Sequence, residues 1–317
     1  MSTSPVPAPV VLRATALTKR YGRLLAVDEL SLAVTAGEVF GLLGPNGAGK
    51  TTTISLLCGL LQPDSGAVLL HERPVRGGDG GLRQRVGVCP QAIVLWPMLT
   101  CLEQLVFVGE LYGLRAQTAR QRALALLEML GLAEKRDQLA RTLSGGMQRR
   151  LNVLLALVHD PEIVVLDEPE AGLDPQSRVL VRDTIRSLAR RKTVLLTTHN
   201  MDEADRLADR VAIIDHGRLL ALDTPEALKG RIGDGDVLEI RLVDGQGEAA
   251  QAVAARLGMT AAARAPGLVV RGRGLVNQLP ALLTALHAAG LTAGEARLRA
   301  NTLEDVFLAL TGRGLRE

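Results

Sequence analysis

The chain has 317 residues, and its 37 Lys+Arg against 34 Asp+Glu give a formal net charge of +3. So small an excess does not by itself indicate a nucleic-acid-binding face, and no nucleic-acid partner is expected. The content of 47% hydrophobic and 22% charged residues argues against disorder. At about 100–200 residues per domain, the length favours two domains. The three cysteines form no C-x-x-C pair, which fits a reduced compartment and argues against a structural zinc site.

Neither a signal peptide nor a membrane span is predicted. The segment Met1–Pro9 is rich in Ser and Pro and lacks a basic start followed by an apolar run, so we expect an unstructured arm. Apolar stretches such as Leu151–Val158 fall far short of the roughly 20 residues that a span needs. If the protein serves a membrane, we expect a partner to do the crossing.

The first part of the chain is predicted to be mostly strands. Strands are expected at Val10–Leu17, Leu32–Val34 and Val39–Leu43, and a Gly-rich segment starting at Gly44 leads into a helix over Thr51–Cys58. A second hairpin around 66–70 and a Gly-rich loop at 77–81 follow. From Leu102 to Val158 the spacing becomes helical, with Gly131 as a helix stop.

Two β/α units come next. Buried strands are predicted at Ile163–Leu166 and Val194–Thr197, each followed by a helix, which indicates a parallel sheet with helices on both faces. Val211–Ile214 and Arg218–Leu222 then predict a hairpin. The run Thr224-Pro225-Glu226 has the N-cap, proline and acid of a helix start.

A Gly/Asp-rich seam at Gly230–Asp236 suggests a domain boundary, which gives predicted domains of residues 1–230 and 231–317. The second is predicted to be a small domain of strands and helices, with strands at Val237–Val243 and Gly267–Val270. One helix carries leucines on one face, at 275, 279, 282, 283 and 286. The lone His287 is interpreted as a surface or packing residue.

The first chemical motif is G-x-x-x-x-G-K-[ST], placed between an apolar strand and a helix. Its glycines let backbone N–H groups surround phosphate oxygens, and the helix N-terminus adds a favourable dipole. Lys50 supplies a charge to the β- and γ-phosphates, Thr51 can ligate Mg²⁺ and Thr52 can bind phosphate. The motif comprises Gly44, Pro45, Asn46, Gly47, Ala48, Gly49, Lys50 and Thr51.

A pair of carboxylates follows the strand at Ile163–Leu166. The strand brings Asp167 to the Mg²⁺ shell, and Glu168 is then placed to polarise a water for attack on the γ-phosphate. Many strands end in acids, so this pattern alone leaves a purely structural role open. The two carboxylates support a hydrolysis site only because the phosphate-binding loop occurs in the same chain.

Ser144, Gly145 and Gly146 open a predicted helix that runs through Leu157, which creates a second anion site. One chain would then have two phosphate cradles and one lysine between them. The economical interpretation is that the second cradle serves the ATP held by another copy. The sequence therefore predicts an assembly of two copies of the chain.

Taken together, the motifs resemble the ATP-binding cassette (ABC) family over roughly residues 10–230. Gly44–Thr51 looks like its Walker A motif, Leu143–Gln148 its signature motif, and Ile163–Asp167 with Glu168 its Walker B and catalytic glutamate. The remaining matches are the Q-loop glutamine Gln91, the D-loop at Ala171–Asp174, the switch histidine His199, and Tyr21 where the family stacks an aromatic on adenine. Taken singly, Gln91, Tyr21 and His199 also have ordinary loop, turn and core interpretations.

The resemblance implies an α/β fold: a P-loop NTPase (RecA-like) core with an antiparallel β subdomain and an α-helical subdomain at about 95–160, plus the small C-terminal α+β domain. It implies ATP and Mg²⁺ as cofactors, with the metal held by Thr51, Gln91 and Asp167. Glu168, His199 and Lys50 are the implied catalytic residues. The implied nucleotide contacts are Tyr21, Gly44 to Thr52, Gln91, Ser144, Gly145, Gly146 and Asp174.

One residue departs from the family pattern. Glu170 stands where the family usually carries Thr or Ser, and it adds a carboxylate near Glu168 and Asp174. Because like charges raise one another's pKa, we expect an effect on dimer closure and turnover. Trp96 and Pro97, after Gln91, are interpreted as packing residues, with contact to a membrane partner as the alternative.

The run Asn301–Phe307 is similar to the end of exporter ATP-binding subunits of the daunorubicin-resistance type. Its simpler interpretation is a helix capped by Thr302, with Leu303, Val306, Phe307 and Leu310 on one face. The expected function is the ATPase subunit of a drug or antibiotic exporter. The resemblance implies a dimer, most simply of identical subunits, that binds a separate integral membrane permease. The chain itself would be cytoplasmic and peripheral on the inner face of the cell membrane.

Other functions stay open at this stage. An importer ATPase, or an exporter of lipid, polysaccharide or ions, would share these motifs. A soluble cassette ATPase of DNA repair or translation is a distant alternative, because the chain has neither a coiled-coil insertion nor a second cassette. The C-terminal domain is either a regulatory ligand-binding module or a dimer contact, and its residues do not decide between them.

Overall fold

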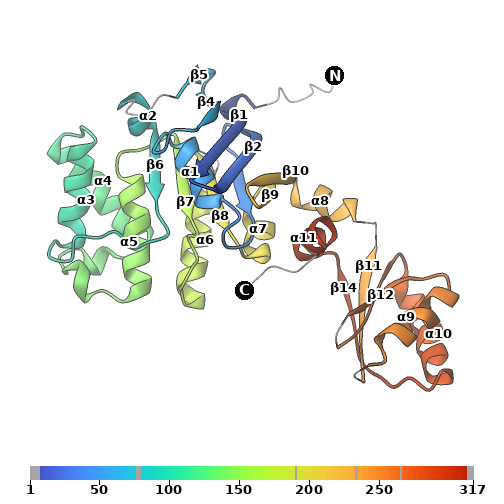
Figure 1. Ribbon diagram of the computed structural model, residues 1–317. Coiled ribbons are helices and arrows are strands. Elements are labelled where there is room, and N and C mark those ends of the chain that lie inside the picture. The colour runs from blue at the N-terminus through green and yellow to red at the C-terminus, as the bar shows by residue number, and fades with distance from the viewer. Residues whose placement is uncertain are drawn as a thin grey trace, which may run out of the picture. The chain divides into compact units, whose positions relative to one another are not determined.

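A computed structural model describes residues 8–75, 80–189, 191–232, 235–243, 245–264 and 266–312. Its described residues form two compact units, one ending at Pro225 and one starting at Glu226 (Figure 1). Most of the predicted N-terminal arm, residues 77–79 of the predicted Gly-rich loop, and residues 233 and 234 of the predicted seam lie outside the described residues. No helix in the described ranges is long and apolar enough to cross a membrane.

A six-stranded sheet forms the centre of the first unit, in the order β10-β9-β3-β8-β7-β6. It is parallel except for β10, which returns antiparallel to β9. The strands are β3 (Val39–Leu43), β6 (Val86–Cys89), β7 (Ile163–Asp167), β8 (Thr193–Thr198), β9 (Arg210–Asp215) and β10 (Arg218–Asp223). Strands β3, β7 and β8 are buried throughout, as their apolar sequences predict.

The register of this sheet decides where the motifs meet. Leu43 pairs with Thr198, and Asp167 pairs with Thr197, so β3, β7 and β8 end at the same edge. The phosphate-binding loop, Glu168 and His199 follow these three ends directly in the chain. Carboxyl ends of parallel strands are the usual ligand-binding edge of such sheets.

A second, antiparallel sheet packs on the first, in the order β2-β1-β4-β5. Its strands are β1 (Val10–Tyr21), β2 (Leu24–Thr35), β4 (Ser65–Leu70) and β5 (Arg73–Pro74). Leu17 and Val27 from this sheet share one apolar core with Phe40 of β3 and Ile54 of the following helix. The strand expected at 32–34 is thus part of a much longer one, because Leu24–Thr35 pairs along nearly the whole of β1.

The helices of the first unit fall into two groups. The first group lies beside the central strands: α1 (Lys50–Leu57), α2 (Gly80–Arg85), α6 (Pro175–Ala189) and α7 (Met201–Leu207), with α8 (Pro225–Arg231) at the unit boundary. A helical subdomain contains α3 (Cys101–Leu111), α4 (Ala116–Met129), α5 (Gly145–Leu157) and the 3₁₀ turns η1 (Ala133–Lys135) and η2 (Ala140–Thr142). Leu105, Leu127 and Leu154 form part of its core. A reciprocal capping box of Thr100 and Glu103 begins α3.

The second unit has the chain order βαββαβ, followed by one more helix. Its elements are β11 (Asp236–Leu242), α9 (Gly247–Arg256), β12 (Thr260–Arg264), β13 (Gly267–Gly272), α10 (Leu275–Ala288), β14 (Ala293–Ala300) and α11 (Leu303–Thr311). The antiparallel sheet has the order β12-β13-β11-β14, which is the ferredoxin-like arrangement. Leu238, Ile240 and Leu242 face α9 and α10 across one core. The opposite face of the sheet is therefore not covered by these two helices.

Sequence reasoning found two strands and two helices of this unit, but no pattern predicted α9, β12 or β14. The sequences of α9 and β12 are rich in alanine, and β14 is exposed along most of its length. None of these three elements therefore has a clear apolar periodicity. The helix at Leu303 begins with the expected Thr302 cap. Leu303, Val306 and Phe307 are buried, whereas Leu310, at the C-terminal end of the same face, is 45% exposed.

Candidate functional site

The loop between β3 and α1 has glycines where no side chain fits. A Cβ on Gly44 would lie 2.4 Å from the Ile214 carbonyl oxygen, and one on Gly49 would lie 2.3 Å from that of Ala26. Gly49 also has a φ of +97°, a left-handed conformation that favours glycine. The loop is thus held tightly against β2 and β9, with its backbone leading into the N-terminus of α1.

Lys50 lies over this loop and beside the carboxylates. Its Nζ donates to the carbonyls of Gly44 at 2.8 Å and Pro45 at 3.0 Å, and lies 3.7 Å from Glu168 Oε1. Burial lowers the pKa of Lys50, and the charges of Glu168 and Asp167 act in the opposite direction. The Lys50 ammonium therefore lies between the backbone oxygens of the loop and the Glu168 carboxylate.

Asp167 is buried at the end of β7 and is fixed from two sides. Its Oδ2 accepts a hydrogen bond from the Thr51 hydroxyl at 3.1 Å, and its Oδ1 accepts one from the Thr197 hydroxyl. The first contact joins residues 116 positions apart, one from each predicted motif. A hydroxyl and a carboxylate oxygen side by side form a donor pair of the kind that Mg²⁺ prefers.

Glu168 is the point at which two further predicted residues, Gln91 and His199, meet. Its Oε2 accepts from Gln91 Nε2 at 2.9 Å, and its Oε1 lies 2.9 Å from His199 Nδ1. The backbone of Glu168 has a φ of +48°, unusual for a residue other than glycine, and its amide is held by the Thr197 carbonyl and hydroxyl. A strained backbone held by neighbouring groups aims this carboxylate into the site.

A cavity of about 480 Å³ lies over the loop. Its lining includes Tyr21, which is half exposed at the end of β1, and Glu168. His216, from the β9–β10 hairpin, also lines it and was not predicted as a site residue. The complete lining is Tyr21, Leu24, Leu25, Ala26, Asn46, Gly47, Gly49, Lys50, Thr51, Thr52, Gln91, Glu168 and His216.

The predicted second cradle does not line this cavity. Ser144 caps α5 by accepting from the Met147 amide at 3.3 Å, and Ser144 and Gly145 are both exposed. A Cβ on Gly146 would lie 3.2 Å from Asp174 Oδ2, so the start of α5 packs against the predicted D-loop. The signature motif and Asp174 thus share a surface separate from the phosphate-binding loop.

Arg149 was missed by sequence reasoning, although it connects three of the motifs. This buried side chain of α5 donates to five backbone carbonyls at 2.5–3.3 Å. The acceptors are those of Pro90, Gln91, Asp167, Glu168 and Pro169. An arginine on the apolar side of a helix was the available signal, because such a charge is buried only where acceptors surround it.

Glu170 has a partner that its neighbours in sequence do not reveal. It is buried, and Arg182 of α6 binds both its carboxylate oxygens. Asp174 does not show the expected rise: hydrogen bonds from Ser177 lower the pKa of its carboxyl. The expectation of mutually raised pKa values was therefore wrong for Asp174.

A raised pKa occurs instead at Glu203 of α7. Burial raises the pKa of this carboxyl to about 7, and the charge of Glu170 acts in the same direction. Its Oε2 accepts from the Thr198 hydroxyl at 2.5 Å, next to His199. Its Oε1 has no hydrogen-bond partner among the described residues.

Trp96 has the packing contact that one of its two interpretations predicted, and part of its ring stays exposed. Its ring packs edge-on against Phe107 of α3 with centroids 5.5 Å apart, yet it remains 40% exposed. Ile93, Val94 and Met98 beside it are also exposed. This part of the helical subdomain therefore presents apolar side chains close to Gln91 in sequence.

Comparison with known proteins assigns the family. Residues 27–171 match the ABC transporter family. The Nod factor export ATP-binding protein I of Burkholderia orbicola (strain AU 1054) is 45% identical over 303 residues, covering 94% of this chain and 96% of that protein. The chain belongs to the ATP-binding subunits of ABC transporters.

Further similarities agree with this assignment. The daunorubicin/doxorubicin resistance ATP-binding protein of Streptomyces peucetius is 42% identical, covering 98% of this chain and 94% of that protein. A dimeric ATP-binding cassette in a post-hydrolysis state, bound to ADP and phosphate, has a TM-score of 0.62 and 25% identity, over 67% of this chain and 98% of that one. As an ABC ATP-binding subunit, the chain binds and hydrolyses ATP, and its P-loop NTPase fold is confirmed.

Proposed function

We propose that the cavity over the β3–α1 loop holds one ATP molecule. Tyr21 stacks on the adenine, and the amides of the glycine loop together with Lys50 bind the phosphates. The position of Tyr21 in the cavity lining and the close backbone approaches of Gly44 and Gly49 support this assignment.

Mg²⁺ fits the same cavity through oxygen donors. Thr51, Asp167 and Gln91 would hold it, as the 3.1 Å contact between the Thr51 hydroxyl and the Asp167 carboxylate suggests. No cluster of three His, Cys, Asp or Glu side chains suited to a metal occurs among the described residues, so phosphate oxygens would complete the shell. The ion would supply charge compensation to the phosphates.

Hydrolysis requires a base, and Glu168 is the candidate. Its carboxylate contacts Gln91 and His199 at 2.9 Å and lies 3.7 Å from Lys50, and this convergence is the observation that carries the proposal. Glu168 accepts a proton from the attacking water, while His199 orients the carboxylate and contacts the γ-phosphate. Lys50 offsets charge on the phosphates.

The exposed signature motif points to a two-chain site. Ser144, Gly145 and Gly146 would bind the ATP held by a second copy, and Asp174 would lie at the contact between the copies. Both surfaces are exposed in the single chain, and a helix N-terminus favours anions. A homodimer follows most simply, because one chain carries both halves.

A separate integral membrane permease is the proposed second partner, with the chain bound peripherally on the cytoplasmic face of the cell membrane. Its docking surface would include the exposed Ile93, Val94, Trp96 and Met98. The Burkholderia relative is named for Nod factor export and the Streptomyces relative for daunorubicin/doxorubicin resistance. We infer export of drugs, antibiotics or other hydrophobic compounds, with lipid, polysaccharide or ion export as the second candidate.

The catalytic assignment is tested with Glu168→Gln, which removes the base and keeps the shape of the side chain. Phosphate release is expected to fall about 10²–10⁴-fold while ATP binding persists. The exposed Glu110→Gln is the matched control and is expected to keep full activity. Full activity of Glu168→Gln would overturn the assignment.

The transport assignment is tested by using the tagged Glu168→Gln chain with Mg-ATP to capture partners from native membranes. Recovery of a multi-span protein supports a transporter and identifies its permease. Recovery of ribosomes, DNA or soluble proteins alone would keep the ATPase and reject its use in transport.

A further inference from the structure

The second unit presents a free sheet edge at β14. In the order β12-β13-β11-β14, this strand pairs with β11 on one side and with no other described strand. Residues 294–298 are all exposed, which leaves room for another strand to approach. Unpaired backbone groups along an edge are a template for strand addition, and proteins often protect such edges with charges.

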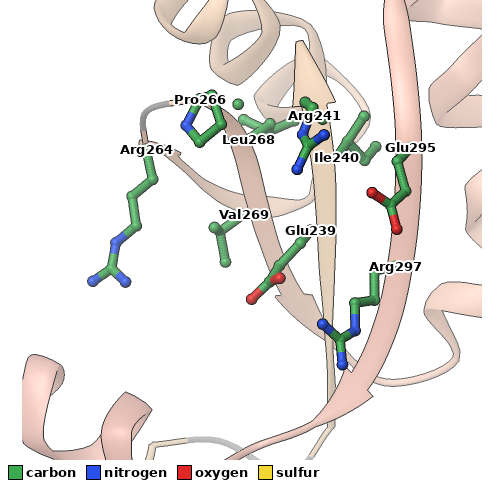
Figure 2. A pocket seen from close by; sticks show the side chains of 10 residues that line it. Glu239, Ile240, Arg241, Arg264, Pro266, Leu268, Val269, Glu295 and Arg297 are labelled. Atoms are coloured by element: carbon green, nitrogen blue, oxygen red, sulfur yellow. The ribbon is translucent and has the colours of Figure 1, made fainter.

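The exposed part of β14 carries one residue of each charge, Glu295 and Arg297. Glu295 and Arg297 are two residues apart, so they lie on the same face, and both line a cavity of about 320 Å³ on the side of the sheet opposite α9 and α10 (Figure 2). Neither side chain has a hydrogen bond or ion pair within the described ranges. Arg299, next on this face, is by contrast bound to Glu239 and Asp305.

We propose that β14 pairs antiparallel with β14 of a second copy of this chain, centred on Ala296. Each Glu295 then lies opposite the Arg297 of the other copy, and the two four-stranded sheets become one. The C-terminal unit is thereby a dimer contact.

The register follows from the side-chain period. Suppose that the faces opposite α9 and α10 lie on the same side in both copies. Because side chains alternate along a strand, the antiparallel pairing must then be centred on one residue, which lies opposite the same residue of the second copy. A centre at Glu295 or at Arg297 would put like charges directly opposite, which destabilises a strand pair. A centre at Ala296 gives two opposite-charge pairs instead. On the other face, Leu298, which is 40% exposed, then packs over the second copy's Gly294.

The other edge of the sheet lacks this complementarity. Strand β12 has only five residues, and its one charged side chain is Arg264. No carboxylate on that strand is available to meet Arg264 of a second copy. The opposite charges of Glu295 and Arg297 therefore favour β14 as the interface.

One added strand pair is weak on its own, because association costs more than two exposed charge pairs return. Pairing of the cassettes around ATP would raise the effective concentration of the two edges. The inference therefore rests on the proposed dimer and is strongest in its ATP-bound state.

Cysteine cross-linking tests the contact in the full chain. Ala296→Cys in the Glu168→Gln background, with Mg-ATP and a mild oxidant, is expected to give a disulfide-linked dimer. The native Cys58, Cys89 and Cys101 are buried, so they do not compete. Ala262→Cys on β12, also exposed, is the matched control and is expected to stay monomeric on denaturing gels.

Charge exchange tests the register. In the Ala296→Cys chain, Glu295→Arg or Arg297→Glu alone places like charges opposite, and the cross-linked fraction is expected to fall about tenfold. Mixing these two variants restores opposite charges, so cross-linking is expected to recover in mixed dimers, identified by tags of different size. A folding defect in either chain would not be repaired by mixing.

Lack of cross-linking at Ala296→Cys, equal cross-linking at Ala262→Cys, or no recovery on mixing would each overturn the proposal. Size-exclusion chromatography of the same samples distinguishes the causes. Cassette dimers without the cross-link reject the β14 contact alone, whereas monomers with Mg-ATP also reject the proposed ATP-driven dimer.

Discussion

Arg182 binds Glu170 through two parallel hydrogen bonds, from Nε to Oε1 at 3.1 Å and from Nη2 to Oε2 at 2.9 Å. This pair compensates the extra carboxylate that distinguishes the chain from the usual family pattern. It also ties the segment after β7 to α6, next to the predicted D-loop. The negative charge of Glu170 is thus compensated by Arg182, which lies twelve residues later in the chain.

The first prediction follows from this pair. Arg182→Met leaves Glu170 buried without a cation, and we expect the free energy of unfolding to fall by about 3 kcal/mol. Adding Glu170→Gln is expected to recover most of the loss, since no uncompensated charge then remains. Urea unfolding of the two single variants and the double variant measures this. Equal stability of Arg182→Met and the double variant would contradict it.

The second prediction concerns Arg149, whose guanidinium joins the Q-loop to the end of β7. Arg149→Lys keeps the charge but cannot reach five carbonyls, so we expect a loss of about 3 kcal/mol. We also expect kcat to fall more than nucleotide affinity, because Gln91 and Glu168 lose their common support. Arg150→Lys, next on the helix and bonded to the Leu130 carbonyl, is the control with a smaller expected loss.

The third prediction is a pH dependence of stability. Because burial raises the pKa of Glu203 from an ordinary 4.5 to about 7, the folded protein keeps this proton to a higher pH than the unfolded chain. Its contribution to stability is complete below the ordinary pKa and is lost as pH rises through about 7.

Relative to Glu203→Gln, the parent chain is therefore expected to lose up to about 3 kcal/mol between pH 4.5 and pH 8. Denaturant unfolding of both chains across this range provides the measurement. A difference that stays constant with pH would mean that Glu203 does not titrate there.

The fourth prediction concerns Lys50. Removing its ammonium with Lys50→Ala is expected to weaken ATP binding about tenfold or more, because the phosphates lose a charge-assisted contact. Fluorescent-nucleotide titration measures the affinity, and Lys229→Ala, outside the cavity, serves as control. Unchanged affinity in Lys50→Ala would count against the phosphate-binding role of this loop.

Much of the site was readable from the sequence because its parts are local. The glycines of the β3–α1 loop, the Ser144 cap and the carboxylates at the end of β7 each belong to one short segment. Backbone conformation and helix capping depend on neighbours in sequence, so their residue types mark them directly. The motif spacing then predicted that these segments work together.

Tertiary structure alone decided which distant groups meet. Gln91 reaches Glu168 across 77 residues, and Arg149 finds its acceptors on two separate segments. Glu170 receives its cation from another helix, and burial of Glu203 sets its pKa. Each depends on desolvation and on contacts created only when the chain packs, and those have no signature in one stretch of sequence.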